Sequence, residues 1–258
     1  MSDTEAASGE FVQSLARGLS VIRAFDAEHP ELTLSEVARR AGLTRAAARR
    51  FLMTLETLGY VRSDARAFTL TPRILELGFS YLSASTLPEI AQPHLERLSR
   101  DVDESVSAGV LDEADIVYVA RVPTRRIMSV RITIGTRFPA YATSIGRALL
   151  AGLPDAEAEA VLDASDLRPL TDRTIADRAE LLAELARVRE QGWAVVDGEL
   201  EPGLRSIAVP LHGRDGTVIA AINVSSSSTR ESTEHQIERY VPALLRTGAA
   251  IDAELRLV

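Results

Sequence analysis

The sequence predicts an α+β protein of two domains, and three observations carry that prediction. Apolar residues follow helical spacing through most of the first seventy residues, which end in two short strand-like runs. From about residue 87 the pattern changes to strand-like runs in pairs, with helices before, between and after them. This pattern is typical of an antiparallel sheet layered with helices. The length of 258 residues suits two modest domains.

Two helices are predicted at the start of the first domain, after a disordered tail over residues 1–13. Residues 14–27 form the first helix, which His29 and Pro30 end. Its apolar residues share one face: Leu15, Leu19, Ile22 and Phe25. Thr33 and Glu36 form a capping-box pattern that opens the second helix, and Gly42 breaks the chain after it.

A third helix and a hairpin complete the first domain, residues 14–71. Thr44 caps the helix, and Gly59 is suited to its C-terminal end. The core-facing residues repeat at helical spacing: Ala48, Phe51, Leu52 and Leu55. Residues 60–63 and 67–70 then read as two strands around a polar turn.

Pro72 starts a linker helix over residues 72–86, and residues 87–258 form the second domain. Five helices are predicted there, at 88–100, 144–152, 155–164, 177–191 and 231–255, the last bent at Pro242. Six strands are predicted, at 105–111, 115–122, 127–134, 193–196, 206–211 and 218–224.

The charge of the chain is segregated along its length. The net charge is −8, and every lysine-or-arginine position is an arginine. Residues 32–73 nevertheless hold eight arginines against three acidic residues, whereas residues 86–258 hold 19 arginines against 27 acidic residues. A compact basic segment therefore precedes an acidic body, and binding to nucleic acid depends on local charge rather than on the total.

Three helices, a tight glycine turn and a hairpin with this charge indicate a winged helix-turn-helix that binds double-stranded DNA. The third helix turns Arg45, Ala46, Arg49 and Arg50 away from the core, where arginine can read guanine in the major groove. Thr44 could donate to a phosphate, Arg62 and Arg66 lie in the wing, and Arg17 on the first helix could reach the backbone. An arginine-rich helix face alone is more often merely solvated.

Other classes of protein find little support. There is no cysteine, no apolar run of the ~20 residues that span a membrane, and no signal-peptide core in residues 1–10. No G-x-S-x-G motif surrounds Ser144, and the four histidines lack metal or triad spacing. Glu199 and Glu201 are expected to be solvated. We expect no catalytic residue, metal or cofactor, and a cytoplasmic, nucleoid-associated protein.

The segment SLARGLSVIRAFDAEHPELTLSEVARRAGLTRAAARRFLMTLETLGYV resembles the DNA-binding domain of the IclR family of transcriptional regulators. LPEIAQPHLERLSRDVDESVSAGVLDEADIVYVARV, GTRFPAYATSIGRALLAGLP and GWAVVDGELEPGLRSIAVPL resemble the family's GAF-like effector-binding domain. The strings RVPTRRIMSV and GTRFPAYATSIGRALLAG are most similar to the branch that controls protocatechuate, 4-hydroxybenzoate and β-ketoadipate catabolism. The resemblance implies an activator or repressor switched by an aromatic-acid or dicarboxylate effector.

The resemblance also implies an effector pocket at nine positions. These are Ile127, Val130, Ser144, Ile145, Val196, Ser206, Ala208, Asn223 and Ser225. Val196 departs from the family pattern, which has an acidic residue at this position. The departure removes a polar contact to the effector and so disfavours the small keto acids that the family also binds.

The residues themselves are compatible with such a pocket. Strand alternation allows Ser206, Asn223 and Ser225 to converge on one interior cavity among apolar neighbours. An anionic effector also needs a cation, for which Arg121, Arg126 and Arg137 are candidates.

One recognition helix reads few base pairs, so a homodimer or a dimer of dimers on a pseudo-palindromic operator is expected. The linker helix would pair with its counterpart. The alternatives are a DNA-binding regulator without an effector and, with less support, a small-molecule hydrolase.

Overall fold

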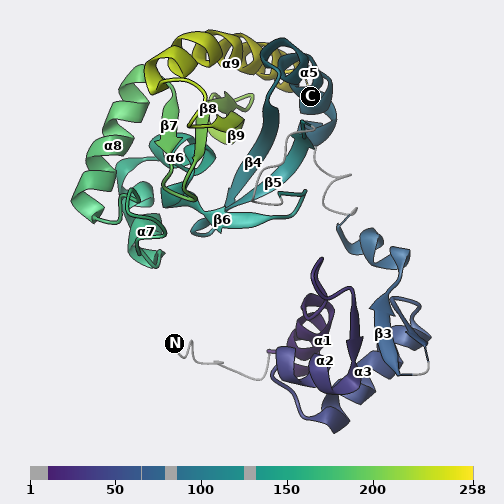
Figure 1. Cartoon of the computed structure of the whole chain (residues 1–258). Coiled ribbons are helices and arrows are strands. Elements are labelled where there is room, and N and C mark those ends of the chain that lie inside the picture. Colours follow the sequence, from purple (N-terminus) through teal and green to yellow (C-terminus); the bar gives the residue numbers. More distant parts are fainter. Residues whose placement is uncertain (1–10, 65, 79–85, 125–131, 258) are drawn as a thin grey trace. The chain divides into compact units, whose positions relative to one another are not determined.

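The computed structural model describes residues 11–64, 66–78, 86–124 and 132–257. The chain divides into two compact units, Met1–Ser83 and Ala84–Val258. Figure 1 shows helices beside a small sheet in the first unit, and a larger sheet covered by helices in the second. The expected tail lies almost wholly outside the described residues, and so does most of the expected linker helix, of which residues 72–78 are described and helical.

The first unit contains the predicted helices and hairpin. Its elements are α1 (Gln13–Arg23), β1 (Glu31–Thr33), α2 (Leu34–Arg40), α3 (Arg45–Thr57), β2 (Val61–Asp64) and β3 (Ala67–Leu70). The capping box at α2 is complete, because the Thr33 side chain accepts from the Glu36 amide while the Glu36 carboxylate accepts from the Thr33 amide. Gly42, between α2 and α3, has a φ of +65°, which accounts for a glycine at this turn.

The sheet of this unit has three strands in the order β1-β3-β2, all antiparallel. Strand β1 was not predicted, because three residues beside a capping box carry no alternation that could reveal them. It brings the start of α2 against the wing, since Leu32 opposes Phe68 in the ladder.

The prediction for α1 was partly wrong. The helix ends at Arg23, and the buried residues near its end are Val21, Ala24 and Phe25. Leu15 is 63% exposed and Leu19 is 39% exposed, although both belong to the predicted apolar face of the helix. The apolar stripe of α1 therefore continues beyond the area that its own domain covers.

The second unit is built on a six-stranded antiparallel sheet with the order β6-β5-β4-β9-β8-β7. Its strands are β4 (Ser105–Asp112), β5 (Asp115–Val122), β6 (Arg137–Pro139), β7 (Ala194–Asp197), β8 (Leu204–His212) and β9 (Val218–Ser227). Its helices are α5 (Thr86–Val102), α6 (Ser144–Ala151), α7 (Asp155–Ala164), α8 (Arg178–Gln191) and α9 (Thr233–Leu255). The predicted α+β class and the antiparallel sheet are confirmed.

Two hydrophobic cores lie on the two faces of this sheet. On one face α5 and α9 pack against residues such as Val106, Val209 and Ile222. On the other face α6 packs against Ala208 and Ala221, and α8 packs against α6. Neighbouring residues along β8 and β9 belong to different cores, as the two-residue period of a strand requires.

One predicted strand differs from the structure. Most of the run 127–134 lies outside the described residues, and Ile132–Ile134 are not in a strand. The strand that pairs with β5 is instead β6, where Phe138 opposes Ile116. The predicted bend of α9 stays a prediction, although Pro242 does lie inside the helix. No described helix is long and apolar enough to cross a membrane.

Candidate functional site

The outer face of α3 carries the predicted DNA-reading side chains. Thr44 is the N-cap, and its hydroxyl oxygen accepts from the Ala47 amide at 3.2 Å. Ala48, Leu52 and Leu55 are buried in the domain core, and the opposite face is exposed. That face presents Thr44, Arg45, Ala46, Arg49 and Arg50. The helix start, with its free amides and the threonine hydroxyl, suits contact with a phosphate.

The arginines of the first unit fall into two groups. Arg40 donates to the Ala24 carbonyl and pairs with Asp26, and Arg73 pairs with Glu76 and stacks over the Tyr60 ring. These two side chains hold the domain together. Among the described residues, none of the eight predicted DNA contacts pairs with a carboxylate, so their arginines remain available to an anionic partner.

The wing and α1 extend this basic surface. Arg62 donates from Nε to the Thr69 hydroxyl at 2.9 Å, which fixes its stem on the hairpin, and Arg66 is exposed at the turn. Arg17 on α1 and Arg50 on α3 line one groove of about 410 Å³. The structure therefore brings Arg17 beside the recognition face.

In the second unit, several of the predicted pocket residues lie in two rows across one face of the sheet. The first row runs Arg121, Ser107, Asn223 and Ala208 over β5, β4, β9 and β8. The second runs Ser105, Ser225, Ser206 and Val196 over β4, β9, β8 and β7. Directly opposed residues share a face, and Ala208 belongs to the core under α6. Both rows therefore face α6.

Helix α6 begins over these rows. Ser144, its first residue, is fully buried and donates to the Ser206 hydroxyl at 2.8 Å. Thr143 caps the helix through the Gly146 amide. The positive end of the α6 dipole thus lies at the polar face of the sheet, where it favours an anion.

A small cavity lies between these rows and the start of α6. It measures about 10 Å³, room for roughly one water molecule. Its polar lining includes Ser206, Asn223 and Ser225, so the predicted convergence is present. Its apolar lining includes Val196 together with residues that sequence reasoning missed: Tyr118, Ile132, Ala142, Leu200 and Leu204.

Of the remaining predicted pocket residues, Ile145 and Ala208 lie near this cavity, and two others lie outside the described residues. Ile145 packs against Gly109, where an added Cβ would lie 3.1 Å from the isoleucine. Ala208 is buried two residues along β8 from Ser206, and neither Ala208 nor Ile145 lines the cavity. Ile127 and Val130 lie outside the described residues.

Two buried polar atoms on this face have no partner among the described residues. Asn223 is 2% exposed; its Nδ2 donates to Ser225 Oγ at 3.1 Å, but its Oδ1 accepts nothing. Arg121 donates from Nη1 to Ser107 Oγ at 3.0 Å, but its Nε is buried without an acceptor. Burial lowers the pKa of Arg121 from its ordinary value, as expected for a desolvated guanidinium without a carboxylate.

Arg137, the other candidate cation among the described residues, does not share this property. Arg137 pairs with Asp112 and with Asp115, and both carboxylates raise its pKa. Arg126 lies outside the described residues. Of the described candidates, Arg121 alone keeps an unsatisfied donor.

Tyr118 contributes a buried phenol to the cavity wall. Its ring meets Phe138 edge to face, with centroids 6.1 Å apart. Burial raises the pKa of Tyr118 to about 12, and the nearby Arg121 opposes that shift. The phenol is therefore a neutral part of the lining at physiological pH.

The expectation that Glu199 is solvated was wrong. Glu199 is 6% exposed and forms a bidentate pair with the fully buried Arg147 of α6, at 2.8 and 2.5 Å. The Arg147 Nε also donates to the Tyr141 carbonyl, and the Ile175 amide donates to Glu199. This network fixes the loop after β7, which carries Leu200, to the helix that begins at the cavity.

The comparisons with known proteins cover both parts of the chain. Residues 14–65 match the IclR helix-turn-helix domain, and residues 79–253 match the C-terminal domain of bacterial transcriptional regulators of the IclR type. An exposed basic helix in a winged domain, together with a ligand-binding domain, defines an effector-responsive transcriptional regulator. The chain belongs to the IclR family.

The relatives narrow this further. The Pca regulon regulatory protein of Pseudomonas putida is 45% identical over 92% of this chain and 81% of its own length. The p-hydroxybenzoate hydroxylase transcriptional activator of Acinetobacter baylyi is 36% identical over 96% and 93%. These relatives are transcriptional regulators, which confirms that the chain is not an enzyme and that it resembles the aromatic-acid branch.

Solved structures share the fold. A candidate transcriptional regulator of Rhodococcus sp. RHA1 matches with a TM-score of 0.86 and 57% identity, over 96% of this chain and 99% of that one. An IclR homologue of Microbacterium hydrocarbonoxydans, complexed with 4-hydroxybenzoate, matches with a TM-score of 0.82 and 27% identity, over 95% and 100%.

Proposed function

We propose that this chain binds operator DNA through α3 and the wing, and that a small aromatic carboxylate held on the α6 face of the large sheet changes its activity on DNA. The observation that carries the effector chemistry is the buried Nε of Arg121, a charged donor without an acceptor. Leaving such a group unsatisfied costs free energy, and a bound carboxylate removes that cost.

The DNA interface consists of the predicted positions. Arg45 and Arg49 lie one turn apart near the start of α3, where a recognition helix meets base edges. Arg50, Arg17 and Thr44 are suited to phosphates beside it, and Arg62 and Arg66 to the backbone or minor groove under the wing. Contacts to base edges set the sequence preference, and contacts to the phosphate backbone set the affinity and its dependence on salt.

The effector would span the first row of the sheet. Arg121 and Asn223 are two strands apart, so their backbones are separated by about 10 Å. A carboxylate at Arg121, with the positive end of α6 on the same face, leaves Asn223 Oδ1 to accept from a hydroxyl group. An aromatic ring carrying both groups at opposite ends, as 4-hydroxybenzoate does, satisfies both atoms.

The apolar lining favours a ring over a small keto acid. Val196 occupies a position at which the family resemblance implies an acid, and Leu200 and Leu204 join it. Apolar walls with a few placed polar groups are typical of sites for aromatic ligands.

The cavity is too small for such a ligand as it stands. A space of about 10 Å³ must widen severalfold to admit a benzoate ring. Binding therefore selects an arrangement in which residues of the wall have moved, and this differential affinity is what can shift the state of the protein. Coupling of ~1–3 kcal/mol, or about 5–150-fold in DNA affinity, is the usual size of such an effect.

Assembly as a homodimer, or a dimer of dimers, is part of the proposal. Leu15 and Leu19 expose the apolar stripe of α1, and Leu75 and Leu77 are exposed after the wing. An exposed apolar helix face is a common contact between copies. Sedimentation of the Leu15→Glu, Leu19→Glu variant should show a weaker dimer than wild type; an unchanged dimer would place the interface elsewhere.

Calorimetry with three matched ligands tests the effector site. Arg121→Gln should weaken binding of 4-hydroxybenzoate by about 10–150-fold, the usual range for a hydrogen bond to a charged group, and leave the neutral 4-hydroxybenzamide nearly unaffected. Asn223→Leu should remove the preference for 4-hydroxybenzoate over benzoate.

Arg137→Gln is the matched control, because the Arg137 guanidinium already has two carboxylate partners. It should bind 4-hydroxybenzoate as wild type does. Equal affinities of Arg121→Gln and Arg137→Gln would contradict the assignment of Arg121.

A further inference from the structure

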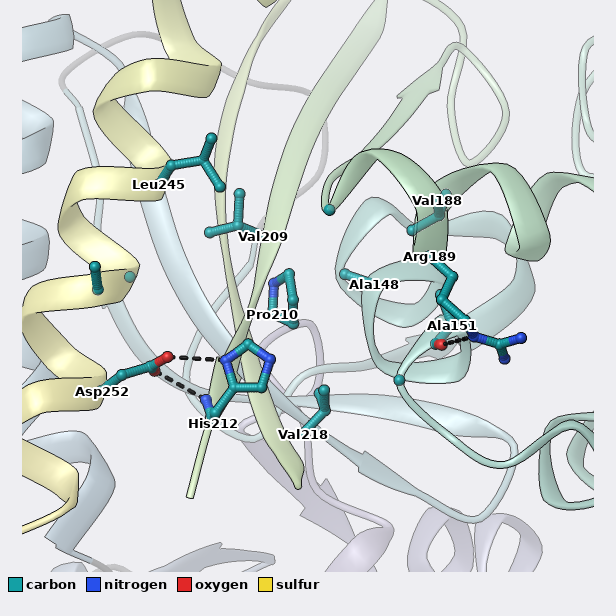
Figure 2. A pocket seen from close by; sticks show the side chains of 14 residues that line it. Ala148, Ala151, Val188, Arg189, Val209, Pro210, His212, Val218, Leu245 and Asp252 are labelled. Atoms are coloured by element: carbon teal, nitrogen blue, oxygen red, sulfur yellow. Dashed lines mark hydrogen bonds and ion pairs between the residues drawn. The ribbon is translucent and has the colours of Figure 1, made fainter. Parts of the chain in front are cut away.

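A second cavity lies at the C-terminal ends of α6 and β8, whereas the effector cavity of the proposed function lies near their N-terminal ends. The second cavity measures about 400 Å³ and is bounded by the C-terminal ends of α6 and α8, the end of β8, and α9 (Figure 2). Ser144 at the start of α6 donates to Ser206, which lines the first cavity, whereas Ala151 and Gly152 at the end of α6 line the second. The two cavities share no lining residue.

The walls of the second cavity are apolar and well held. Val188, Val209, Val218 and Leu245 face it from four different elements (Figure 2). Arg189 also lines it, but its guanidinium donates to the Ala151 carbonyl at 2.7 Å, the Leu153 carbonyl at 3.0 Å and Asp155 at 2.7 Å. Arg189 therefore braces α8 against the end of α6 and offers no free charge to a ligand.

His212 and Asp252 supply the polar group of this cavity. Asp252 accepts from the His212 backbone amide at 2.8 Å and from its Nδ1 at 2.8 Å. A carboxylate only accepts, so Nδ1 carries the proton and Nε2 of the neutral ring is an acceptor. No described residue donates to Nε2. Figure 2 shows the ring between α9 and the wall formed by α6 and α8.

The edge of β8 at this cavity is poorly suited to an added peptide strand. Strand β7 pairs with β8 only as far as Ala208, so the edge continues unpaired past Pro210 to His212. Pro210 has no amide hydrogen, and the His212 amide is taken by Asp252. A small molecule fits the cavity better, since its volume lies in the range of ligand sites.

We propose that this cavity is a second ligand site, which takes a small neutral phenol whose hydroxyl donates to His212 Nε2 while its ring packs on the valines and Leu245. An uncharged ligand is indicated because the charge of Arg189 is already paired with Asp155 and because Asp252 would repel an anion. The proposal is independent of the effector site, because it concerns different residues and a ligand without a carboxylate.

Fluorine NMR of the full chain with 4-fluorophenol tests this proposal. Saturable binding is expected, and 4-fluoroanisole, which lacks the donor, should bind about tenfold more weakly, the usual effect of one lost hydrogen bond. His212→Phe should abolish that difference. Gly248→Leu should abolish binding of both probes, because the leucine side chain fills the cavity. Gly248 lies inside α9, and the nearest atom to an added Cβ, on Val209, is 3.4 Å away, which is an ordinary contact distance.

Two further variants locate the probe. Arg246→Ala, on the exposed side of α9, and Ser144→Trp, which places an indole beside the first cavity, should both bind 4-fluorophenol as wild type does. Unchanged binding in folded Gly248→Leu, or loss in Ser144→Trp alone, would overturn the proposal, as would equal affinity for the two probes in the wild type.

Discussion

Arg147 of α6 and Glu199 of the loop after β7 form a buried ion pair, with both guanidinium Nη atoms on the two carboxylate oxygens at 2.8 and 2.5 Å. The pair joins the helix that begins at the effector cavity to the loop whose Leu200 lines that cavity. Both partners also bond to backbone groups, Arg147 to the Tyr141 carbonyl and Glu199 to the Ile175 amide. A buried ion pair offsets its desolvation cost only when its geometry is good and further hydrogen bonds satisfy its remaining polar groups, and both conditions are met here.

Removing one partner of this pair should be strongly destabilising. Arg147→Met should lower the free energy of unfolding by about 3–5 kcal/mol, because it leaves the Glu199 carboxylate buried without its cation. Arg147→Met with Glu199→Leu should recover a large part of that loss, and denaturant titration measures both. Arg168→Ala is the control, since Arg168 pairs with Asp166 on the surface and should cost under about 1 kcal/mol. Equal losses for Arg147→Met and Arg168→Ala would show that the buried pair contributes no more than a surface pair.

Tyr118 predicts a dependence of stability on alkaline pH. Burial raises the pKa of Tyr118 to about 12 from an ordinary value of 10. The folded state therefore keeps a proton that the unfolded state loses, and stability falls as pH rises from 10 to 12, by at most about 1.4 kcal/mol per pH unit. Below pH 10 this contribution is fully present. Tyr118→Phe has no phenol to titrate, so its stability should fall less over this pH range. The unfolding free energy of wild type minus that of Tyr118→Phe should therefore decrease between pH 10 and pH 12. A difference that stays constant would contradict the raised pKa of Tyr118.

Arg49 and Arg66 should affect DNA binding in different ways. Arg49→Ala should cost about 1–3 kcal/mol of specific binding and relax the preference at one base pair, because α3 presents this side chain to the groove. Arg66→Ala in the wing should weaken all sequences alike and reduce the dependence on salt. Fluorescence titrations on operator variants at several salt concentrations separate these effects. A uniform loss for Arg49→Ala would assign it to phosphate instead.

Ser144→Trp should separate DNA binding from the effector response. The Ser144 side chain is buried against Ser206 at the cavity, so an indole there fills the space that the effector needs. Operator affinity without effector should stay within about twofold of wild type, since the change lies in the other unit. The response to effector should be lost, and a response of normal size would show that the effector binds elsewhere.

The sequence predicted the parts of the fold that rest on local signals. The capping box of Thr33 and Glu36, the Thr44 cap and the left-handed Gly59 after α3 all have local causes, and all are present. Strand alternation likewise placed Ser206, Asn223 and Ser225 on one face.

What depends on contacts distant in sequence could not be predicted. The burial of Glu199 depends on Arg147, 52 residues away, and its loop has the composition of a solvated turn. The exposure of Leu15 cannot be read from periodicity, because an apolar stripe looks the same whether its own domain or a second copy covers it. Arg121 was one of three candidate cations, and only its partners distinguish it from Arg137.

Titration of the full-length protein onto its own upstream intergenic DNA at fixed salt, with and without 4-hydroxybenzoate, protocatechuate or β-ketoadipate, is the decisive test of the proposed function. We expect specific binding that at least one aromatic acid changes by about 5–150-fold, and we expect Arg121→Gln to bind the same DNA without this change. Specific binding that none of the three compounds alters, or a wild-type response in Arg121→Gln, would contradict it.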